Sequence, residues 1–234
     1  MSRSEGKKVR LVKVLLVLVV YQLSLVASWA QDEPEYRLEI GGGIGTVTYL
    51  GDYNDNLLKG MQPWVTVMAK YKINPRMAVG ATLGYGRLKG SSDNVTTWYP
   101  QNRHEFGTKM LDGGLRFEYN FWPYGTGREY RGAQRLTPYI APGFGITYHG
   151  GPDKGVAVNL PLGAGVKYKI GDRLNLAAEW RMHFTLSDKL DGWTDPYGIK
   201  SSGIFKNTDC FSILQVILTY DLWAKCKTCH NDRD

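Results

Sequence analysis

Polar and apolar residues alternate along most of this chain with a period of two, a pattern typical of β-strands with two different faces. The clearest case is the segment 174–187. One of its faces is wholly apolar and comprises Leu174, Leu176, Ala178, Trp180, Met182, Phe184 and Leu186. The other carries ionisable groups and comprises Asn175, Ala177, Glu179, Arg181, His183, Thr185 and Ser187. We therefore predict a strand here that separates an apolar environment from a polar one.

Similar alternation, with more glycine, occurs in other parts of the chain. It predicts further strands at 36–49, 61–73, 76–88, 106–121, 135–149, 156–170 and 209–223. Glycine clusters fall inside several of these segments, where they suit the tight curvature of a small closed barrel. No stretch with the helical period of 3.6 runs longer than a turn or two, so the fold class is all-β.

The segments between the expected strands differ in length in a systematic way. Short turns are expected at 74–75 and 171–173 and a middling one at 123–133. Longer connections are expected at 50–60, 89–105 and 188–208, with a modest one at 150–155. Loops that are longer mainly at one end are typical of outer-membrane proteins. The pattern predicts an eight-stranded antiparallel up-and-down transmembrane β-barrel with both termini on the periplasmic side.

Alternation alone does not show which face points outward, because a soluble lipocalin-like barrel would turn its apolar face inward around a ligand. Three features favour the membrane. The expected strands exceed the roughly 9–11 residues that cross a bilayer. Aromatic residues gather near strand ends as in interfacial girdles: Tyr36, Tyr71, Phe121, Trp122, Tyr168, Tyr220 and Trp223 on one side, and Tyr49, Trp64, Tyr85 and Tyr148 on the other. The opposite face carries charges that could pair inside a narrow lumen: Glu39, Asp112, Arg116, Glu118, Lys167, Lys169, Glu179, Arg181 and His183.

The first thirty residues have the composition of a targeting signal. A basic region precedes an apolar run at 14–26, and Ser28 and Ala30 are the small residues that a signal peptidase requires. The run is shorter than the roughly 20 residues of a membrane-spanning helix. We predict that residues 1–30 are a cleaved secretory signal peptide, 31–223 an outer-membrane β-barrel and 224–234 a periplasmic C-terminal tail.

Removing this signal changes the meaning of the net charge. The whole chain carries +7, which suggests an acidic or nucleic-acid partner. Five basic residues and one acidic residue lie in the signal, which leaves the mature chain at +3. The near balance disfavours nucleic-acid binding. The 28 glycines and 15 tyrosines instead match the composition of small β-barrels.

The motif Cys226-Lys-Thr-Cys229-His230 matches the c-type haem attachment signature. No apolar segment follows it to bury a haem, and no methionine lies nearby as an axial ligand. A zinc site of two cysteines and a histidine would lack a fourth ligand. Cys210 is expected near the far end of the last strand, beyond disulfide distance. We therefore expect no cofactor or metal, and a disulfide through Cys226 and Cys229, either internal or to a partner protein.

A membrane-embedded enzyme that modifies lipids is an alternative from another class. Glu179, His183 and Ser187 share one strand face, but residues four apart on a strand are about 13 Å apart and cannot form a triad alone. Pairing of charges in the lumen explains them better. We expect His104 and His149, in or beside the long loops, to be solvated.

Several motifs, taken in order along the mature chain, resemble the PorG-like outer-membrane proteins, the barrel components of the type IX secretion system. They are Leu50-Gly-Asp-Tyr-Asn54, Tyr71-Lys-Ile-Asn-Pro-Arg76, Leu83-Gly-Tyr-Gly-Arg87, Phe117-Glu-Tyr-Asn-Phe-Trp-Pro-Tyr124, Thr137-Pro-Tyr-Ile-Ala-Pro-Gly-Phe-Gly145, Leu162-Gly-Ala-Gly-Val-Lys-Tyr168, Glu179-Trp-Arg181 and Leu190-Asp191. The resemblance implies a non-enzymatic barrel that ties a periplasmic ring of the machinery to the outer membrane. Its expected contacts with ring subunits are 31–36, the turn 123–134 and the tail 224–234.

Overall fold

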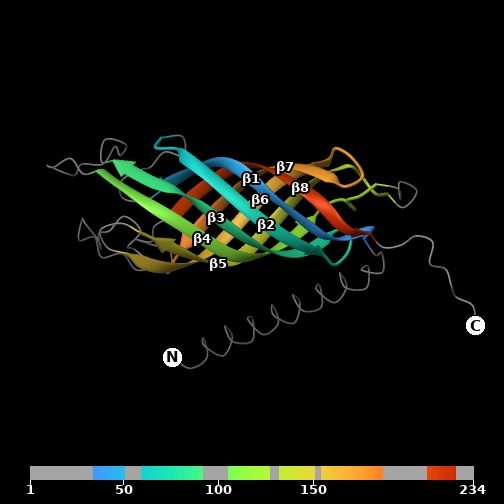
Figure 1. Ribbon diagram of the computed structural model, residues 1–234, viewed down its shortest axis with the longest axis horizontal. Coiled ribbons are helices and arrows are strands. Elements are labelled where there is room, and N and C mark those ends of the chain that lie inside the picture. Colours follow the sequence, from blue (N-terminus) through green and yellow to red (C-terminus); the bar gives the residue numbers. More distant parts are fainter. Residues whose placement is uncertain are drawn as a thin grey trace, which may run out of the picture. The chain divides into compact units, whose positions relative to one another are not determined.

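The computed structural model describes residues 34–50, 59–91, 105–126, 132–150, 154–186 and 210–224 of the chain. These residues form a series of long antiparallel strands (Figure 1). The strands are β1 (Tyr36–Leu50), β2 (Gln62–Lys72), β3 (Met77–Ser91), β4 (Glu105–Asn120), β5 (Leu136–His149), β6 (Gly155–Lys169), β7 (Leu174–Thr185) and β8 (Cys210–Ala224). No helix within the described ranges is long and apolar enough to span a membrane.

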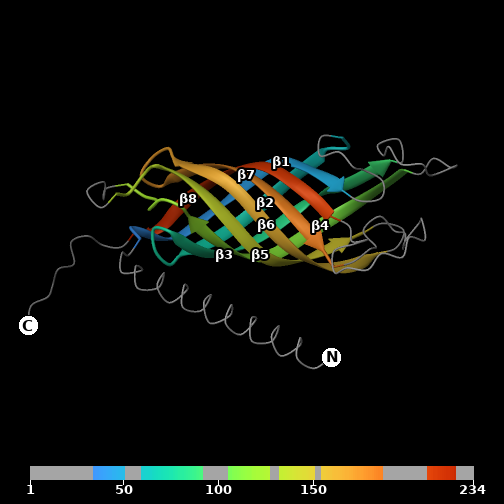
Figure 2. The same ribbon diagram turned by 180° about the vertical axis from the view of Figure 1, so that it is seen from behind.

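The strands close into one barrel in sequence order. Closure occurs between β1 and β8, which pair from Tyr36 opposite Ala224 to Leu50 opposite Cys210. Views from opposite sides show a continuous wall of tilted strands around the lumen (Figures 1 and 2). Closure pairs the backbone groups of each strand with both neighbours and leaves no open sheet edge.

The prediction of eight antiparallel strands in an up-and-down barrel is confirmed. Most strand ends lie within one residue of the expected positions. The largest difference is at β3, which continues past the expected end at 88 to Ser91. This extension pairs with the beginning of β4, where Ser91 lies opposite Glu105. The end of β3 is thus set by backbone pairing with β4, and the sequence of β3 alone does not show where that pairing ends.

The two ends of the barrel differ, and we name them by their connections. The turn end has the connections 73–76, 121–135 and 170–173 and the described ends of the chain at 34 and 224. The loop end is where the connections 51–61, 92–104, 150–154 and 186–209 leave the barrel. The turn at 73–76 is held by the Asn74 side chain, whose Oδ1 accepts from the backbone N–H groups of Arg76 and Met77 at 2.8 and 2.7 Å.

The alternation along the strands divides the side chains between the inside and the outside of the barrel. Large apolar side chains are exposed on the outer surface, among them Ile44, Val67, Leu83, Leu115, Phe144, Leu162, Trp180 and Val216. Charged and polar side chains are buried inside. This arrangement is the reverse of that in a soluble barrel, because the exposed face is the apolar one.

Candidate functional site

The lumen is the part of the molecule where the chemically active side chains collect. The structure places all nine expected lumen charges inside it and buries each of them: Glu39, Asp112, Arg116, Glu118, Lys167, Lys169, Glu179, Arg181 and His183. They lie in successive clusters along the barrel, and Arg116, which is 3.6 Å from Glu118, joins the cluster around Glu118 to the one around Glu179.

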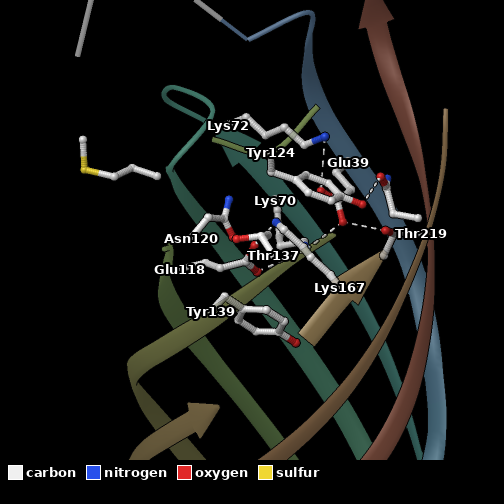
Figure 3. A network of polar contacts seen from close by, with 12 residues as sticks. Glu39, Lys70, Lys72, Glu118, Asn120, Tyr124, Thr137, Tyr139, Lys167 and Thr219 are labelled. Atoms are coloured by element: carbon white, nitrogen blue, oxygen red, sulfur yellow. Dashed lines mark hydrogen bonds and ion pairs between the residues drawn. The ribbon is translucent and has the colours of Figure 1, made fainter. Parts of the chain in front are cut away.

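The cluster nearest the turn end is organised around Glu118 on β4 (Figure 3). Glu118 accepts hydrogen bonds from Lys167 on β6 and from Lys70 on β2, the latter at 3.2 Å. Lys70 also pairs with Glu39 on β1 at 2.7 Å, and Glu39 accepts from the Thr219 hydroxyl at 2.5 Å. The cluster therefore crosses the lumen and connects strands on opposite walls.

Asp221 on β8 anchors the second group at this end. Lys72 pairs with its Oδ1 at 2.5 Å, and Lys169 pairs with its Oδ2 at 2.6 Å. Asn175 donates to Asp221 Oδ1 at 3.1 Å. Lys72 also lies 3.4 Å from Glu39, which joins this group to the cluster around Glu118.

Further along the lumen, Glu179 on β7 accepts four different donors. The Arg116 and Arg181 guanidinium groups each donate to it at 2.5 Å. The Tyr139 hydroxyl donates at 2.8 Å and the Gln215 amide at 3.0 Å. Charge-assisted contacts of this kind are among the stronger hydrogen bonds in proteins. Glu179 thereby fixes side chains from β4, β5, β7 and β8 in one arrangement.

A smaller polar cluster lies closer to the loop end, around Asp112. Thr147 and Asn159 donate to Asp112 Oδ2 at 2.8 and 2.7 Å. His183 Nδ1 lies 3.8 Å from the same oxygen, and the imidazole stacks on Phe211 with ring centroids 4.2 Å apart. His183 therefore lies at the boundary between polar and apolar parts of the lumen.

Apolar side chains fill the lumen at the loop end. This apolar cluster comprises Val47, Tyr49, Trp64, Leu88, Met110, Ala157, Phe211 and Ile213. The Trp64 indole lies against Gly84 and Gly86 of β3, where an added Cβ would overlap its ring. Its Nε1–H donates to the Thr66 hydroxyl at 2.7 Å, so its polar atom is also satisfied. Glycine at these two positions makes room for the largest side chain in the lumen.

At the turn end the mouth of the lumen is covered by Tyr124, from the connection 121–135. Its hydroxyl donates to Asn175 Oδ1 at 2.8 Å, and the Lys167 ammonium lies 4.4 Å from its ring centroid. Lys169 lies 5.7 Å from the Tyr124 ring and 5.6 Å from that of Tyr36. Burial, together with the nearby lumen carboxylates, raises the pKa of the Tyr124 phenol above its ordinary value. The phenol is therefore a stable hydrogen-bond donor at neutral pH.

The charges in the lumen nearly balance. The described lumen holds six cationic side chains, Lys70, Lys72, Arg116, Lys167, Lys169 and Arg181, against the five carboxylates of Glu39, Asp112, Glu118, Glu179 and Asp221. The lumen charges expected from the sequence do not include Lys70, Lys72 and Asp221. A signal for them exists, because they alternate with the outward-facing Tyr71 and Tyr220. Such pairing neutralises the lumen and ties its walls together. Within the described ranges no group of His, Cys, Asp or Glu is arranged to hold a metal ion.

The expected aromatic girdles are wrong at three positions. Tyr49 and Trp64 lie inside the barrel in the apolar cluster, and Tyr36 is buried at the turn-end mouth. Trp64 shares its strand face with Lys70, so the alternation itself directs it inward. The other members of the girdles are exposed on the outer surface: Tyr71, Phe121, Trp122, Tyr168, Tyr220 and Trp223 near the turn end, and Tyr85 and Tyr148 near the loop end.

The histidine and cysteine predictions have different outcomes. His149 was expected to be solvated, but it is only 2% exposed, because β5 continues to this residue and directs its side chain inward with Thr147. His104, Ser187, Cys226, Cys229 and His230 lie outside the described residues. The expected signal peptide and C-terminal tail also lie there, except for Ala224.

Comparison with known proteins agrees with this architecture. The sequence profile of the outer membrane protein beta-barrel domain family matches residues 14–204. Among solved structures, Neisserial surface protein A has a TM-score of 0.48 and 14% identity over 79% of this chain and 97% of its own. The outer membrane protein OprG from Pseudomonas aeruginosa has a TM-score of 0.48 and 12% identity, over 83% of this chain and 99% of its own. The N-terminal barrel domain of OprF from the same organism has a TM-score of 0.44 and 12% identity, over 79% of this chain and 98% of its own. No curated protein matches by sequence.

Proposed function

Because this chain belongs to the outer membrane protein beta-barrel domain family, we propose that it is a non-enzymatic outer-membrane component of the type IX protein secretion machinery. In this function the barrel is a fixed anchor in the outer membrane, and its turn end faces the periplasm. There it organises a ring complex of periplasmic subunits.

The observation that carries the proposal is the ordered series of motifs that resembles the PorG-like barrels. Three of these motifs lie at the turn end, where a periplasmic partner would bind. Residues 71–76 include the first turn, Phe117–Tyr124 leads into the second, and 162–168 runs toward the third. The resemblance therefore includes the side of the barrel that the proposed function requires.

The filled lumen supports a structural function rather than transport of a solute. Ion pairs link opposite walls near the turn end, and the apolar cluster occupies the loop end. Side chains fill the interior of barrels of this size, so we expect the described part of the lumen to offer no continuous water-filled path. We therefore expect such a barrel to act through its outer surface, and above all through contacts at its ends.

The turn end has an anchored segment that could present a partner surface. Tyr124 is fixed in the mouth by Asn175, and its backbone N–H donates to the Pro75 carbonyl at 3.0 Å. On the two arms of the same connection, the Gly125 N–H donates to the Gln134 carbonyl at 3.2 Å and the Gln134 N–H donates to the Pro123 carbonyl at 2.8 Å. We propose that the turn 123–134, the stretch 31–36 and the tail 224–234 together contact the ring subunits.

A pull-down from detergent-solubilised outer membranes tests this function. The bait is the full-length protein with an affinity tag inserted into a loop-end connection, and the control is an unrelated eight-stranded barrel with the same tag. We expect periplasmic secretion subunits to be recovered with the protein and not with the control. Replacing 127–131 by a short glycine-serine segment should reduce recovery while the barrel still folds.

Two results would overturn the proposal. One is recovery of no secretion subunits under conditions that preserve a known ring complex. The other is loss of a lipid A modification in a deletion strain with normal protein secretion, which would favour the lipid-modifying enzyme.

The cysteines of the tail give a narrower test of the same contacts. We propose that Cys226 and Cys229 are oxidised, either to each other or to a ring subunit. Non-reducing gels of the wild type, Cys226→Ser and Cys229→Ser should then differ in mobility or in the presence of a mixed-disulfide band. Free thiols and unchanged mobility in all three proteins would contradict this.

A further inference from the structure

The outer surface of the barrel has a hollow of about 720 Å³ near the turn end. It extends over the outer faces of strands β1 to β5, which lie next to one another in the wall (Figure 1). Tyr71, Phe117 and Phe144 are among its lining residues, together with Ala69 and Val79. A volume of this size is within the range of about 300–1,000 Å³ typical of small-molecule sites.

The hollow arises from the sizes of neighbouring outward-facing side chains. Ala69 on β2 pairs with Ala81 on β3, so two short side chains lie together in one row. The next row toward the turn end contains Tyr71 opposite Val79, and Val79 is opposite Phe117 on β4. Short side chains next to long ones leave a depression in the apolar surface.

The position of the hollow indicates what fills it. It lies on the outer face of an outer-membrane barrel, on the lipid side of the girdle residue Tyr71. Acyl chains surround this surface, and contact with a chain that follows the depression gains dispersion energy that a flat surface would not. The lining also includes Lys70 and Arg116, but their side chains are buried in the lumen. The side chains exposed in the hollow are therefore apolar, which matches the hydrocarbon of a lipid.

A cationic side chain, Arg76, lies in the turn beyond the end of the hollow that faces the turn end. Arg76 is the last residue of the turn 73–76, three residues before Val79. Its Nη1 donates to the Phe121 carbonyl at 3.1 Å, and its own carbonyl accepts from Asn120 at 2.7 Å. No carboxylate in the described part of the chain forms an ion pair with Arg76. The hydrogen bond to Phe121 holds the Arg76 guanidinium in place. Its other N–H groups can therefore bind a phosphate.

We propose that the hollow and Arg76 together hold one anionic phospholipid of the periplasmic leaflet. One acyl chain lies in the depression over Ala69, and the phosphate is bound by Arg76, with Tyr71 and Phe121 at the level of the headgroup. The turn end is the periplasmic end in barrels of this family's type, which places the site in the phospholipid leaflet. This site is independent of the proposed secretion function, because it requires only the barrel and its membrane.

The test uses the full-length protein reconstituted in nanodiscs of equal parts phosphatidylglycerol and phosphatidylethanolamine. Native mass spectrometry after transfer to detergent counts the lipids that remain bound. We expect one retained phosphatidylglycerol. Ala69→Phe fills the hollow, and Arg76→Gln removes the charge. Each should lower retention about tenfold, the effect of losing one charge-assisted contact or an equivalent apolar contact.

The matched control is Ala178→Phe, the same enlargement at an exposed outward position on β7, away from the hollow. It should retain phosphatidylglycerol like the wild type. Heat-modifiable gel mobility establishes that each variant is folded. Equal retention in all four proteins would show only non-specific surface lipid and would overturn the proposal. So would selective retention of phosphatidylethanolamine, or of lipopolysaccharide when the protein is purified directly from outer membranes.

Discussion

Glu118 and Trp64 both point into the lumen, from β4 and β2, but they fill it by different means. Glu118 binds Lys70 and Lys167 through directional ionic contacts. Trp64 packs on the backbone of β3, and the residues around it are mostly apolar. The ion-paired half near the turn end thus depends on charge partners, whereas the apolar cluster at the loop end depends on volume.

The alternation of polar and apolar residues in a barrel strand therefore decides only which side chains point inward. What fills the interior is a separate property of each level of the barrel. A polar lumen is the usual arrangement in outer-membrane barrels. Here the loop end has apolar residues on both faces of the wall, for example Ile213 inside and Leu214 outside on β8. The two halves should therefore respond differently to the same kind of substitution.

The largest effect is expected for Glu179→Leu in the ion-paired half. The substitution keeps an approximately similar volume but leaves Arg181 buried without its carboxylate and Arg116 with only the more distant Glu118. Breaking a buried pair in this way should lower the free energy of unfolding by about 3–5 kcal/mol. Urea titration of the protein in lipid vesicles, followed by tryptophan fluorescence, measures it. Asp172→Asn, at an exposed turn position, is the control and should change little. A change below about 1 kcal/mol for Glu179→Leu would show that the ion pairs do not hold this half together.

A somewhat smaller effect is expected for Leu88→Ala in the apolar cluster, where the side chain is fully buried. The loss of buried apolar surface and the cavity left in the cluster should lower the free energy of unfolding by about 2–4 kcal/mol. The sharper comparison is between substitutions that keep volume. Leu88→Met should cost less than about 1.5 kcal/mol. Glu118→Gln, which also keeps volume, should cost about 2–3 kcal/mol because Lys167 loses its carboxylate partner and Lys70 is left with Glu39 alone. Equal costs for these two would remove the distinction between the halves.

The contact between Trp64 and β3 gives a test by a double-mutant cycle. A Cβ at Gly84 would overlap the indole, so Gly84→Ala should destabilise the protein by about 1–3 kcal/mol. In a Trp64→Leu background the same change should cost clearly less. Gly107→Ala is the control, because a Cβ there meets no atom within 4 Å. Additive effects at Gly84 and Trp64 would mean that the ring does not rest on β3.

The smallest effect concerns Tyr124, which covers the turn-end mouth. Tyr124→Phe removes the hydrogen bond to Asn175 and should cost about 0.5–1.5 kcal/mol at neutral pH. Because the folded protein raises the pKa of this phenol, the unfolded chain loses the proton first, near pH 10. The stabilisation from Tyr124 is therefore fully present below pH 10 and is lost as the pH rises further. Wild-type stability should fall more steeply than that of Tyr124→Phe in unfolding titrations between pH 9 and about 11. Parallel curves would contradict the buried position of the phenol.

The strands and their inward faces follow from the sequence alone, because the period of two is a local property. Lys70, Lys72 and Asp221 could have been assigned to the lumen by the same rule. Trp64 lies close to a strand end, which wrongly suggests a girdle position, whereas its strand face directs it into the lumen. The individual contacts could not be predicted. The pairing of Lys72 with Asp221 depends on how far the strands are staggered when the barrel closes, and no single strand encodes that stagger.

The hollow over Ala69 has the same kind of origin as the lumen contacts. Each of its residues is an ordinary outward-facing member of its strand. The depression arises where the register places the short Ala69 one row away from Tyr71 and Phe117. The shape of a barrel surface thus depends on several strands together, whereas the direction of each side chain, inward or outward, depends on its own strand.

We propose that the two halves together close the lumen and that the barrel is an anchor and not a pore. Conductance of the purified full-length protein in a planar lipid bilayer tests this most directly. We expect no stable current steps for the wild type, nor for Leu88→Ala or Tyr124→Phe, since each leaves one half of the lumen filled. A steady, large conductance from the folded wild-type protein would contradict the claim.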